Sequence, residues 1–126
     1  MLDLANVQAP IETANCLPNA CYIDPAVYQH EQNTLFRNSW VAVGFGKDIP
    51  QPGCVKPVNF SGLPMLLVRN QNDNINVLHN VCRHRGMILV DTAKQLHGPI
   101  TCPYHAWAYD LDGALRKTPH VGGPDI

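Results

Sequence analysis

The stretch that decides the fold is a pair of short motifs, CRHRG at residues 82–86 and CPYHAWAYDLDG at residues 102–113. Each motif begins with a cysteine and has a histidine two or three positions later, so the sequence offers four potential metal ligands: Cys82, His84, Cys102 and His105. Seventeen residues separate the first histidine from the second cysteine. Thiolates and imidazoles both bind transition metals. The repeated pairing therefore predicts two loops that close over one metal centre.

The sequence around the two motifs is typical of a mostly β protein. Eleven prolines and nine glycines in 126 residues indicate many turns. Short apolar runs predict strands over residues 40–45, 54–60, 63–70 and 75–80, and a last hairpin over residues 106–117. Turns are expected between them at Ser61-Gly62, at residues 71–74 and at Asp112-Gly113. We expect antiparallel sheets in a β-sandwich or small barrel, with the two motifs in loops between strands.

A single helix is expected near the N-terminus. Residues 1–22 predict an irregular lead-in, with prolines at positions 10 and 18. The helix lies in the following stretch IDPAVYQHEQNTLFRNSW, where Asp24 can cap it and Pro25 suits its first position. An apolar stripe recurs along this stretch, and we expect it to pack against the sheet: Val27, Tyr28, Leu35 and Phe36.

Length, charge and cysteine count limit the possible functions. The chain is long enough for one domain with its own core. A formal charge of −1 argues against a general attraction to nucleic acid or to anionic membrane, and no apolar run reaches the roughly 20 residues that span a bilayer. Five cysteines cannot all pair in internal disulfides. With no basic segment followed by an apolar one at its start, the sequence predicts a cytoplasmic protein.

The motifs allow two kinds of metal centre. Two thiolates and two imidazoles suffice for a structural zinc site. Such sites usually group their cysteines in one arm, whereas here each arm has one cysteine and one histidine. That distribution suits a centre with two unlike metal positions, each bound from both arms. A Rieske [2Fe–2S] cluster has this requirement, because one iron takes two cysteines and the other takes two histidines.

The motifs resemble those of the Rieske domain in the large (α) subunit of ring-hydroxylating oxygenases, a family whose members act on aromatic rings or on quaternary amines. The resemblance extends from about Thr13 to about His120, through YIDPAVYQHEQNTLFRNSWVAVGFGKDIPQPG and PMLLVRNQNDNINVLHNVCRHRG. It implies a Rieske domain over residues 23–120, built of antiparallel sheets with an N-terminal helix. The cluster-binding subdomain would cover about residues 80–108. Residues 121–126 would begin a linker to a catalytic domain that this chain lacks.

The resemblance also assigns roles to individual residues. The two cysteines, Cys82 and Cys102, would bind the inner iron of one [2Fe–2S] cluster per chain, and the two histidines, His84 and His105, would bind the outer iron. Four further residues would form or cover the cluster loops: Arg85, Gly86, Tyr104 and Trp107. The other histidines have no matched ligand nearby, and we expect them to have no role in the centre: His30, His79, His97 and His120.

Rieske proteins fall into a high-potential and a low-potential branch, and the residues at positions 87 and 104, Met87 and Tyr104 here, distinguish the two. High-potential Rieske proteins carry two further cysteines there, which bridge the loops, and this sequence has neither. The chain therefore resembles the low-potential branch.

The function that the resemblance implies is electron transfer. The cluster would relay single electrons from a flavin reductase or a ferredoxin to a mononuclear iron in the catalytic domain of a neighbouring α subunit, with His105 facing that neighbour. Oligomers are expected only of the full-length protein. The chain has no pair of histidines matching that mononuclear iron site, so whether it is an enzyme by itself stays open. The alternative is a stand-alone Rieske ferredoxin, against which the helical segment of roughly forty residues argues.

Overall fold

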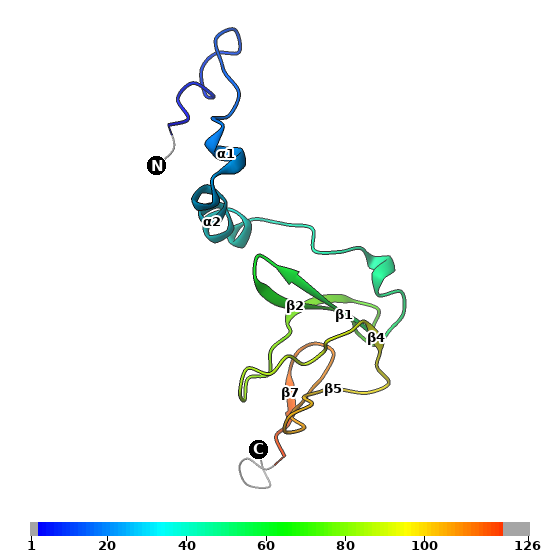
Figure 1. Ribbon diagram of the computed structural model, residues 1–126. Coiled ribbons are helices and arrows are strands. Elements are labelled where there is room, and N and C mark those ends of the chain that lie inside the picture. Colours follow the sequence, from blue (N-terminus) through cyan, green and yellow to red (C-terminus); the bar gives the residue numbers. More distant parts are fainter. Residues whose placement is uncertain (1–2, 120–126) are drawn as a thin grey trace. The chain divides into compact units, whose positions relative to one another are not determined.

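The computed structural model describes residues 3–119 and divides the chain into two compact units, one ending at Val41 and one beginning at Ala42 (Figure 1). His120 and the predicted linker over residues 121–126 lie outside the described residues. Within the described part of the chain, no helix is both long enough and apolar enough to cross a membrane. Each unit is described by itself below.

The first unit contains the predicted helix. A short helix, α1 (Ala20–Ile23), precedes α2 (Pro25–Thr34), and a 3-10 turn, η1, follows at Phe36–Asn38. The predicted cap is confirmed, because the Asp24 carboxylate accepts a hydrogen bond from the Ala26 backbone N–H at 2.8 Å. Within this unit none of the ten residues of α2 is buried, and Tyr28 and Leu35 are more than half exposed. Packing of the apolar stripe against the sheet stays a prediction.

The strand predicted over residues 40–45 is wrong. This segment is extended, but it pairs with no strand among the described residues, and Trp40 and Phe45 are exposed. A 3-10 turn, η2 (Gly46–Asp48), follows it. At Gly44 the chain lies so close to Leu67 that an added Cβ would overlap the leucine side chain. Gly44 therefore packs against Leu67, and residues 40–45 form no strand in the described part of the chain.

The second unit is built on a four-stranded antiparallel sheet. Its strands are β1 (Cys54–Phe60), β2 (Leu63–Arg69), β3 (Ile75–His79) and β4 (Lys94–Gln95), in the order β3-β2-β1-β4. The tight turn predicted at Ser61-Gly62 is confirmed: both residues have positive φ angles, 49° and 77°, and join β1 to β2 in register from Phe60↔Leu63. Positive φ at both central positions is the geometry whose twist matches a two-residue hairpin.

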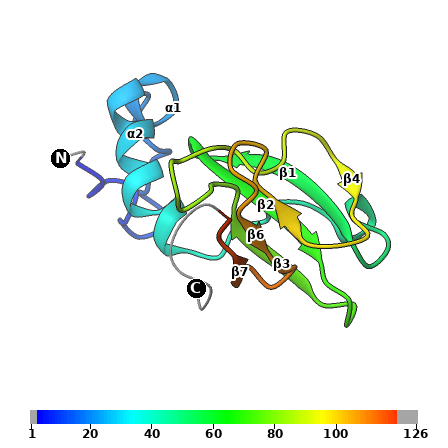
Figure 2. The same cartoon turned by 90° about the horizontal axis from the view of Figure 1, so that it is seen from below.

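A smaller three-stranded sheet follows. It contains β5 (Ile100–Thr101), β6 (Ala108–Tyr109) and β7 (Leu115–Lys117), in the order β5-β6-β7. The predicted Asp112-Gly113 turn is confirmed between β6 and β7, with Gly113 at φ 87°. The mostly antiparallel β architecture is therefore as the sequence predicted, and the strands are visible from below in Figure 2.

The core lies between the two sheets and the loops that join them. Alternate residues of β2 point into it, and Leu66 and Val68 are completely buried. They pack in one cluster with side chains from both sheets and both loops, among them Val55, Cys82, Val90, Ile100, Cys102 and Tyr109. Burying each large aliphatic side chain contributes about 1.5–3 kcal/mol. The two cysteine side chains are therefore held inside the packed part of the unit.

Three polar side chains join the two sheets at their turns. Asn70, which is buried, donates to the Asp112 carboxylate at 2.7 Å, and Asn76 donates to the same oxygen at 2.8 Å. The Asn70 side-chain oxygen accepts the backbone N–H groups of Asn72 and Asn74 at the β2–β3 turn. The turn between β6 and β7 is thus attached to the hairpin of the larger sheet.

The chain needs glycine at position 53. Gly53 has φ 86°, its N–H donates to the Arg69 carbonyl, and its own carbonyl accepts the Leu96 N–H. A Cβ there would collide with the Leu96 backbone oxygen. We predict that Gly53→Ala lowers the free energy of unfolding by about 2–4 kcal/mol, through backbone strain and overlap together. Gly62→Ala is the control, since φ is positive there too but the space is open, and it should cost about 1 kcal/mol. Equal losses in urea titrations of the two variants would contradict the predicted overlap.

Asp110 gives the unit a dependence on pH. Burial raises the pKa of this carboxyl, but hydrogen bonds from the Ala114 backbone, the Arg116 side chain and the Asp112 backbone outweigh it and leave the pKa below 3.8. A carboxyl whose pKa falls on folding stabilises the folded state above its ordinary pKa, and that contribution disappears as the pH falls through the lowered value. Asp110→Asn should therefore cost about 1 kcal/mol at pH 7 and progressively less between pH 4 and pH 2.

The matched control is Asp91→Asn, because this exposed carboxylate accepts a bond from the neighbouring Thr92 hydroxyl. Its effect should be small at every pH. Urea unfolding of both variants between pH 2 and pH 7 tests the prediction, which would be wrong if the Asp110→Asn deficit stayed constant down to pH 2.

Candidate metal centre

The first motif folds into a closed loop. Val81 and Ile88 form an isolated antiparallel bridge at its base. Inside that bridge, the Cys82 N–H donates to the Met87 carbonyl at 2.7 Å, and the Gly86 N–H donates back to the Cys82 carbonyl at 3.0 Å. Both backbone groups of the cysteine are therefore bound, which fixes the direction in which its thiol points.

The second motif folds in the same way. The Cys102 N–H donates to the Trp107 carbonyl at 2.8 Å, and the Ala106 N–H donates to the Cys102 carbonyl at 3.1 Å. This loop is closed at its base by β5 and β6, which pair residue 101 with 108 and residue 100 with 109. The two cysteines thus occupy equivalent places, twenty positions apart, in two loops of one design.

Each loop needs a left-handed residue four positions after its cysteine. The φ angle is 69° at Gly86 and 57° at Ala106. An L residue in this conformation costs about 1–2 kcal/mol relative to right-handed geometry, so the second loop carries a strain that the glycine of the first loop avoids. A Cβ on Gly86 would meet open space. The glycine is therefore favoured by its backbone conformation and not by crowding.

The two thiols are the buried part of the site. Cys82 is 1% exposed and Cys102 is 3% exposed. The Cys82 sulfur lies 3.3 Å from the Tyr109 hydroxyl, and that hydroxyl accepts the Arg83 backbone N–H at 3.0 Å. Either atom of this pair could donate when the cysteine is a thiol, but a Cys82 thiolate can only accept, so toward the thiolate the Tyr109 hydroxyl is the donor.

The surroundings of Cys82 favour its thiolate. Burial raises the pKa of the Cys82 thiol, but hydrogen bonds from the Tyr109 hydroxyl, the His84 backbone, the Cys102 side chain and the Arg85 backbone outweigh it and lower the pKa overall. Burial also raises the pKa of Tyr109, and its hydrogen bond to Cys82 raises it further, so the phenol keeps its proton. The thiolate is the form that binds metal.

The two imidazoles form the more open side of the site. His84 and His105 are half-buried, with ring centroids 4.8 Å apart. Trp107 stacks on His84 with the ring planes 7° apart and the centroids 4.7 Å apart. Tyr104 lies against His105 at 3.8 Å, and the Arg85 guanidinium is 5.9 Å from the Tyr104 ring centre. Each histidine ring is therefore held by an aromatic neighbour from the second loop.

The arrangement fits a group with two unlike metal positions. Within residues 3–119, no three His, Cys, Asp or Glu side chains surround a position for a single metal ion. The four donors are split into a buried thiol pair and a half-buried imidazole pair. Among the described residues, the Trp107 indole N–H next to them is buried and has no hydrogen-bond partner. A buried donor left over at this place suits an electronegative group held between the loops.

The structure thus brings all eight predicted site residues into the two loops. Met87 and Tyr104 are both exposed, at the positions where a bridging disulfide would need cysteines. Cys16, Cys21 and Cys54 are free thiols outside the loops. The sequence analysis missed Tyr109, although a buried tyrosine on the strand that follows the second motif is a signal that could have indicated it.

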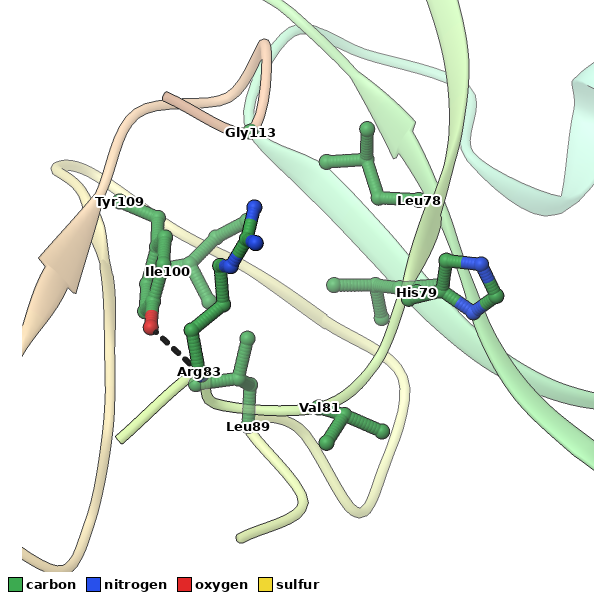
Figure 3. Close-up of a pocket in the computed structure, with 9 residues that line it drawn as sticks. Leu78, His79, Val81, Arg83, Leu89, Ile100, Tyr109 and Gly113 are labelled. Atoms are coloured by element: carbon green, nitrogen blue, oxygen red, sulfur yellow. Dashed lines mark hydrogen bonds between the residues drawn. The ribbon is translucent and has the colours of Figure 1, made fainter. Parts of the chain in front are cut away.

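A cavity in the second unit lies apart from the metal centre. Its volume is about 450 Å³, and its walls are mainly apolar: Leu66, Leu78, Val81, Leu89, Ile100 and Tyr109, with His79, Arg83 and Gly113 completing them. Figure 3 shows the tyrosine hydroxyl reaching across to the Arg83 backbone N–H on one side of it. None of the four candidate ligands lines this cavity. The candidate metal ligands therefore lie in the two loops and not in this cavity.

Comparison with known proteins identifies relatives along most of the chain. It is 40% identical over 110 residues to the oxygenase subunit of glycine betaine monooxygenase from Chromohalobacter salexigens, an alignment covering 87% of this chain and 25% of that protein. It is 33% identical over 113 residues to the oxygenase subunit of carnitine monooxygenase from Acinetobacter pittii, covering 87% and 30%. The chain thus spans between a quarter and a third of the length of these relatives.

Solved structures agree with this relationship. A quaternary ammonium Rieske monooxygenase superposes with a TM-score of 0.77 at 32% identity, over 85% of this chain and 30% of that one. Naphthalene 1,2-dioxygenase from Rhodococcus superposes with a TM-score of 0.79 at 28% identity, over 93% and 26%. The family model of the Rieske [2Fe–2S] domain matches residues 39–123, which include both loops. The chain therefore belongs to the Rieske [2Fe–2S] domain family, as found in the α subunits of Rieske oxygenases.

Proposed function

We propose that Cys82 and Cys102 bind one iron of a Rieske [2Fe–2S] cluster and that His84 and His105 bind the other. The observation that carries this proposal is the pairing of two buried thiols with two half-buried imidazoles across two loops of one design. A Rieske cluster needs that division of ligands. Four neighbours form the loops around it: Arg85, Gly86, Tyr104 and Trp107.

When bound, the cluster takes up and releases one electron at a time. The protein's part is to fix the ligands and to tune that exchange. Hydrogen bonds from the Tyr109 hydroxyl and from loop amides to the Cys82 sulfur stabilise extra negative charge on the thiol side. Trp107 and Tyr104 hold the imidazole planes and cover them from water. Met87 and Tyr104 cannot form a disulfide, which supports assignment to the low-potential branch.

The electron would pass on to a larger oxygenase. We propose that this chain is the Rieske part of an α subunit that takes electrons from a reductase or ferredoxin and passes them to a mononuclear iron in a catalytic domain. A structural study of the related quaternary ammonium monooxygenase describes inter-subunit electron transfer in that enzyme, which supports a neighbouring subunit as the acceptor. The two relatives described above, and others named as monooxygenases of glycine betaine, carnitine or choline, act on quaternary ammonium compounds. They favour a quaternary ammonium substrate over an aromatic ring.

The alternative, a stand-alone Rieske ferredoxin, is less well supported, because the relatives named above are oxygenase subunits. The domain limits of 23 and 120 and the cytoplasmic location remain predictions from the sequence. The family match begins later, at residue 39.

The ligand set is tested by spectroscopy of the purified protein. We expect a red-brown protein whose dithionite-reduced form gives a rhombic electron paramagnetic resonance signal with an average g of about 1.9. Cys82→Ser and His105→Asn should each abolish this signal. Cys54→Ser and His97→Asn are matched controls outside the loops and should retain it. A colourless wild-type protein with one equivalent of zinc, after iron and sulfide reconstitution, would refute the proposal.

Tyr109 should raise the reduction potential of the cluster. Its hydroxyl donates to the Cys82 sulfur, and a hydrogen bond to a thiolate favours the more negative, reduced state. We predict that Tyr109→Phe lowers the midpoint potential by at most about 65–130 mV, the one-electron equivalent of one hydrogen bond to a charged group (about 1.5–3 kcal/mol). Protein-film voltammetry measures this shift. Tyr104→Phe is the control, because the Tyr104 side chain is exposed and contacts a histidine ring and not a sulfur. Equal shifts in the two variants would contradict a direct effect on the thiolate.

A further inference from the structure

Asn80 is one of the two buried polar side chains in the described part of the chain, and it stands immediately before the first loop. It is 2% exposed. Its amide nitrogen donates to the Val90 carbonyl at 2.6 Å, and its amide oxygen accepts the Val90 N–H at 3.0 Å. A single side chain thus binds both backbone groups of the residue at the far end of the loop. The nine residues between them include Cys82 and His84.

The second loop provides a comparison for the role of the Asn80 side chain. With an offset of twenty positions, the Val81↔Ile88 bridge corresponds to the Thr101↔Ala108 pair. The next pair outward in the second loop is Ile100↔Tyr109, joined through the backbone. With the same offset, Asn80 corresponds to Ile100 and Leu89 corresponds to Tyr109, and neither Asn80 nor Leu89 belongs to a named strand among the described residues. The Asn80 side chain binds Val90, one residue beyond Leu89.

The reason lies in the backbone of Asn80. Its N–H donates to the Pro64 carbonyl at 2.8 Å and thereby continues the pairing of β3 with β2. That backbone group is therefore committed to the larger sheet and is not available to the loop. An asparagine side chain carries the same donor and acceptor as a peptide group. The Asn80 side chain can therefore bind Val90 while the Asn80 backbone N–H stays bound to Pro64.

We propose that Asn80 is a positioning residue for the cluster, and that its side chain closes the first loop by binding both backbone groups of Val90, where the second loop has a second backbone strand pair. Without it, the Val90 N–H and carbonyl would be buried without these partners, and the loop would be held by the Val81↔Ile88 bridge and the backbone bonds of Cys82 alone. The second loop would keep its two backbone pairs. The inference rests on the proposed ligand set, since it concerns how Cys82 and His84 are presented, and it holds whichever partner takes the electron.

The test compares Asn80→Ala with Asn70→Ala in the cluster-loaded protein. Asn70 is the other buried polar residue and binds the β2–β3 turn and Asp112, away from the cysteines. We expect Asn80→Ala to speed hydrogen exchange of residues 81–90 about tenfold or more over residues 100–109. It should also shift the g values of the reduced cluster and speed its loss to an iron chelator by a similar factor. Asn70→Ala should leave these three readouts unchanged.

Two outcomes would overturn the proposal: equal acceleration of both segments in Asn80→Ala, or the same changes in Asn70→Ala. If Asn80→Ala does not fold, Asn80→Ser provides the same comparison with one hydroxyl able to bind Val90, and the same two outcomes decide it. The ligand assignment fails separately. If Cys82→Ser kept the cluster, the ligand set would be wrong while the difference in exchange between the loops would stand.

Discussion

The structure depends on one constraint, which is that each cysteine must be held from both of its backbone sides. In each loop the cysteine N–H donates five residues ahead and its carbonyl accepts from four residues ahead. This double attachment turns the chain back on itself within six residues and leaves the thiol pointing to the inside of the turn. It also sets the need for a left-handed residue at 86 and at 106. The two sheets serve to bring these two turns face to face.

The features predicted correctly from the sequence are those decided by local chemistry. The Asp24-Pro25 cap, the Ser61-Gly62 turn and the Asp112-Gly113 turn each depend on the conformational preferences of one or two residues. The strand over 40–45 was predicted from its apolar alternation, but a strand also needs a partner with free backbone groups. No such partner lies beside it among residues 3–119.

The site residues also divide into those that local sequence could predict and those that it could not. Spacing and residue type were enough to select the four proposed ligands, since a cluster with two unlike irons needs ligands of both types from each arm. Tyr109 and Asn80 were not selected. Each acts on a residue that is ten or more positions away in sequence, and a tyrosine on a strand or an asparagine at a strand end has many ordinary roles. Ala106 was missed because its importance lies in its φ angle, which the residue type argues against.

The unequal burial of the two ligand pairs has a consequence for the direction of electron transfer. Around Cys82, hydrogen-bond donors to the sulfur are already in place and water is excluded. A protein that docked on this side would therefore change the surroundings of the sulfur little. The histidine pair is half-exposed and is bordered by exposed apolar and aromatic side chains, Met87, Ile88 and Tyr104. A partner that covered these groups would remove water from the imidazole edges and shorten the path to the cluster. Under the proposed ligand set, the thiol side therefore sets the potential, and the imidazole side is where the electron enters and leaves.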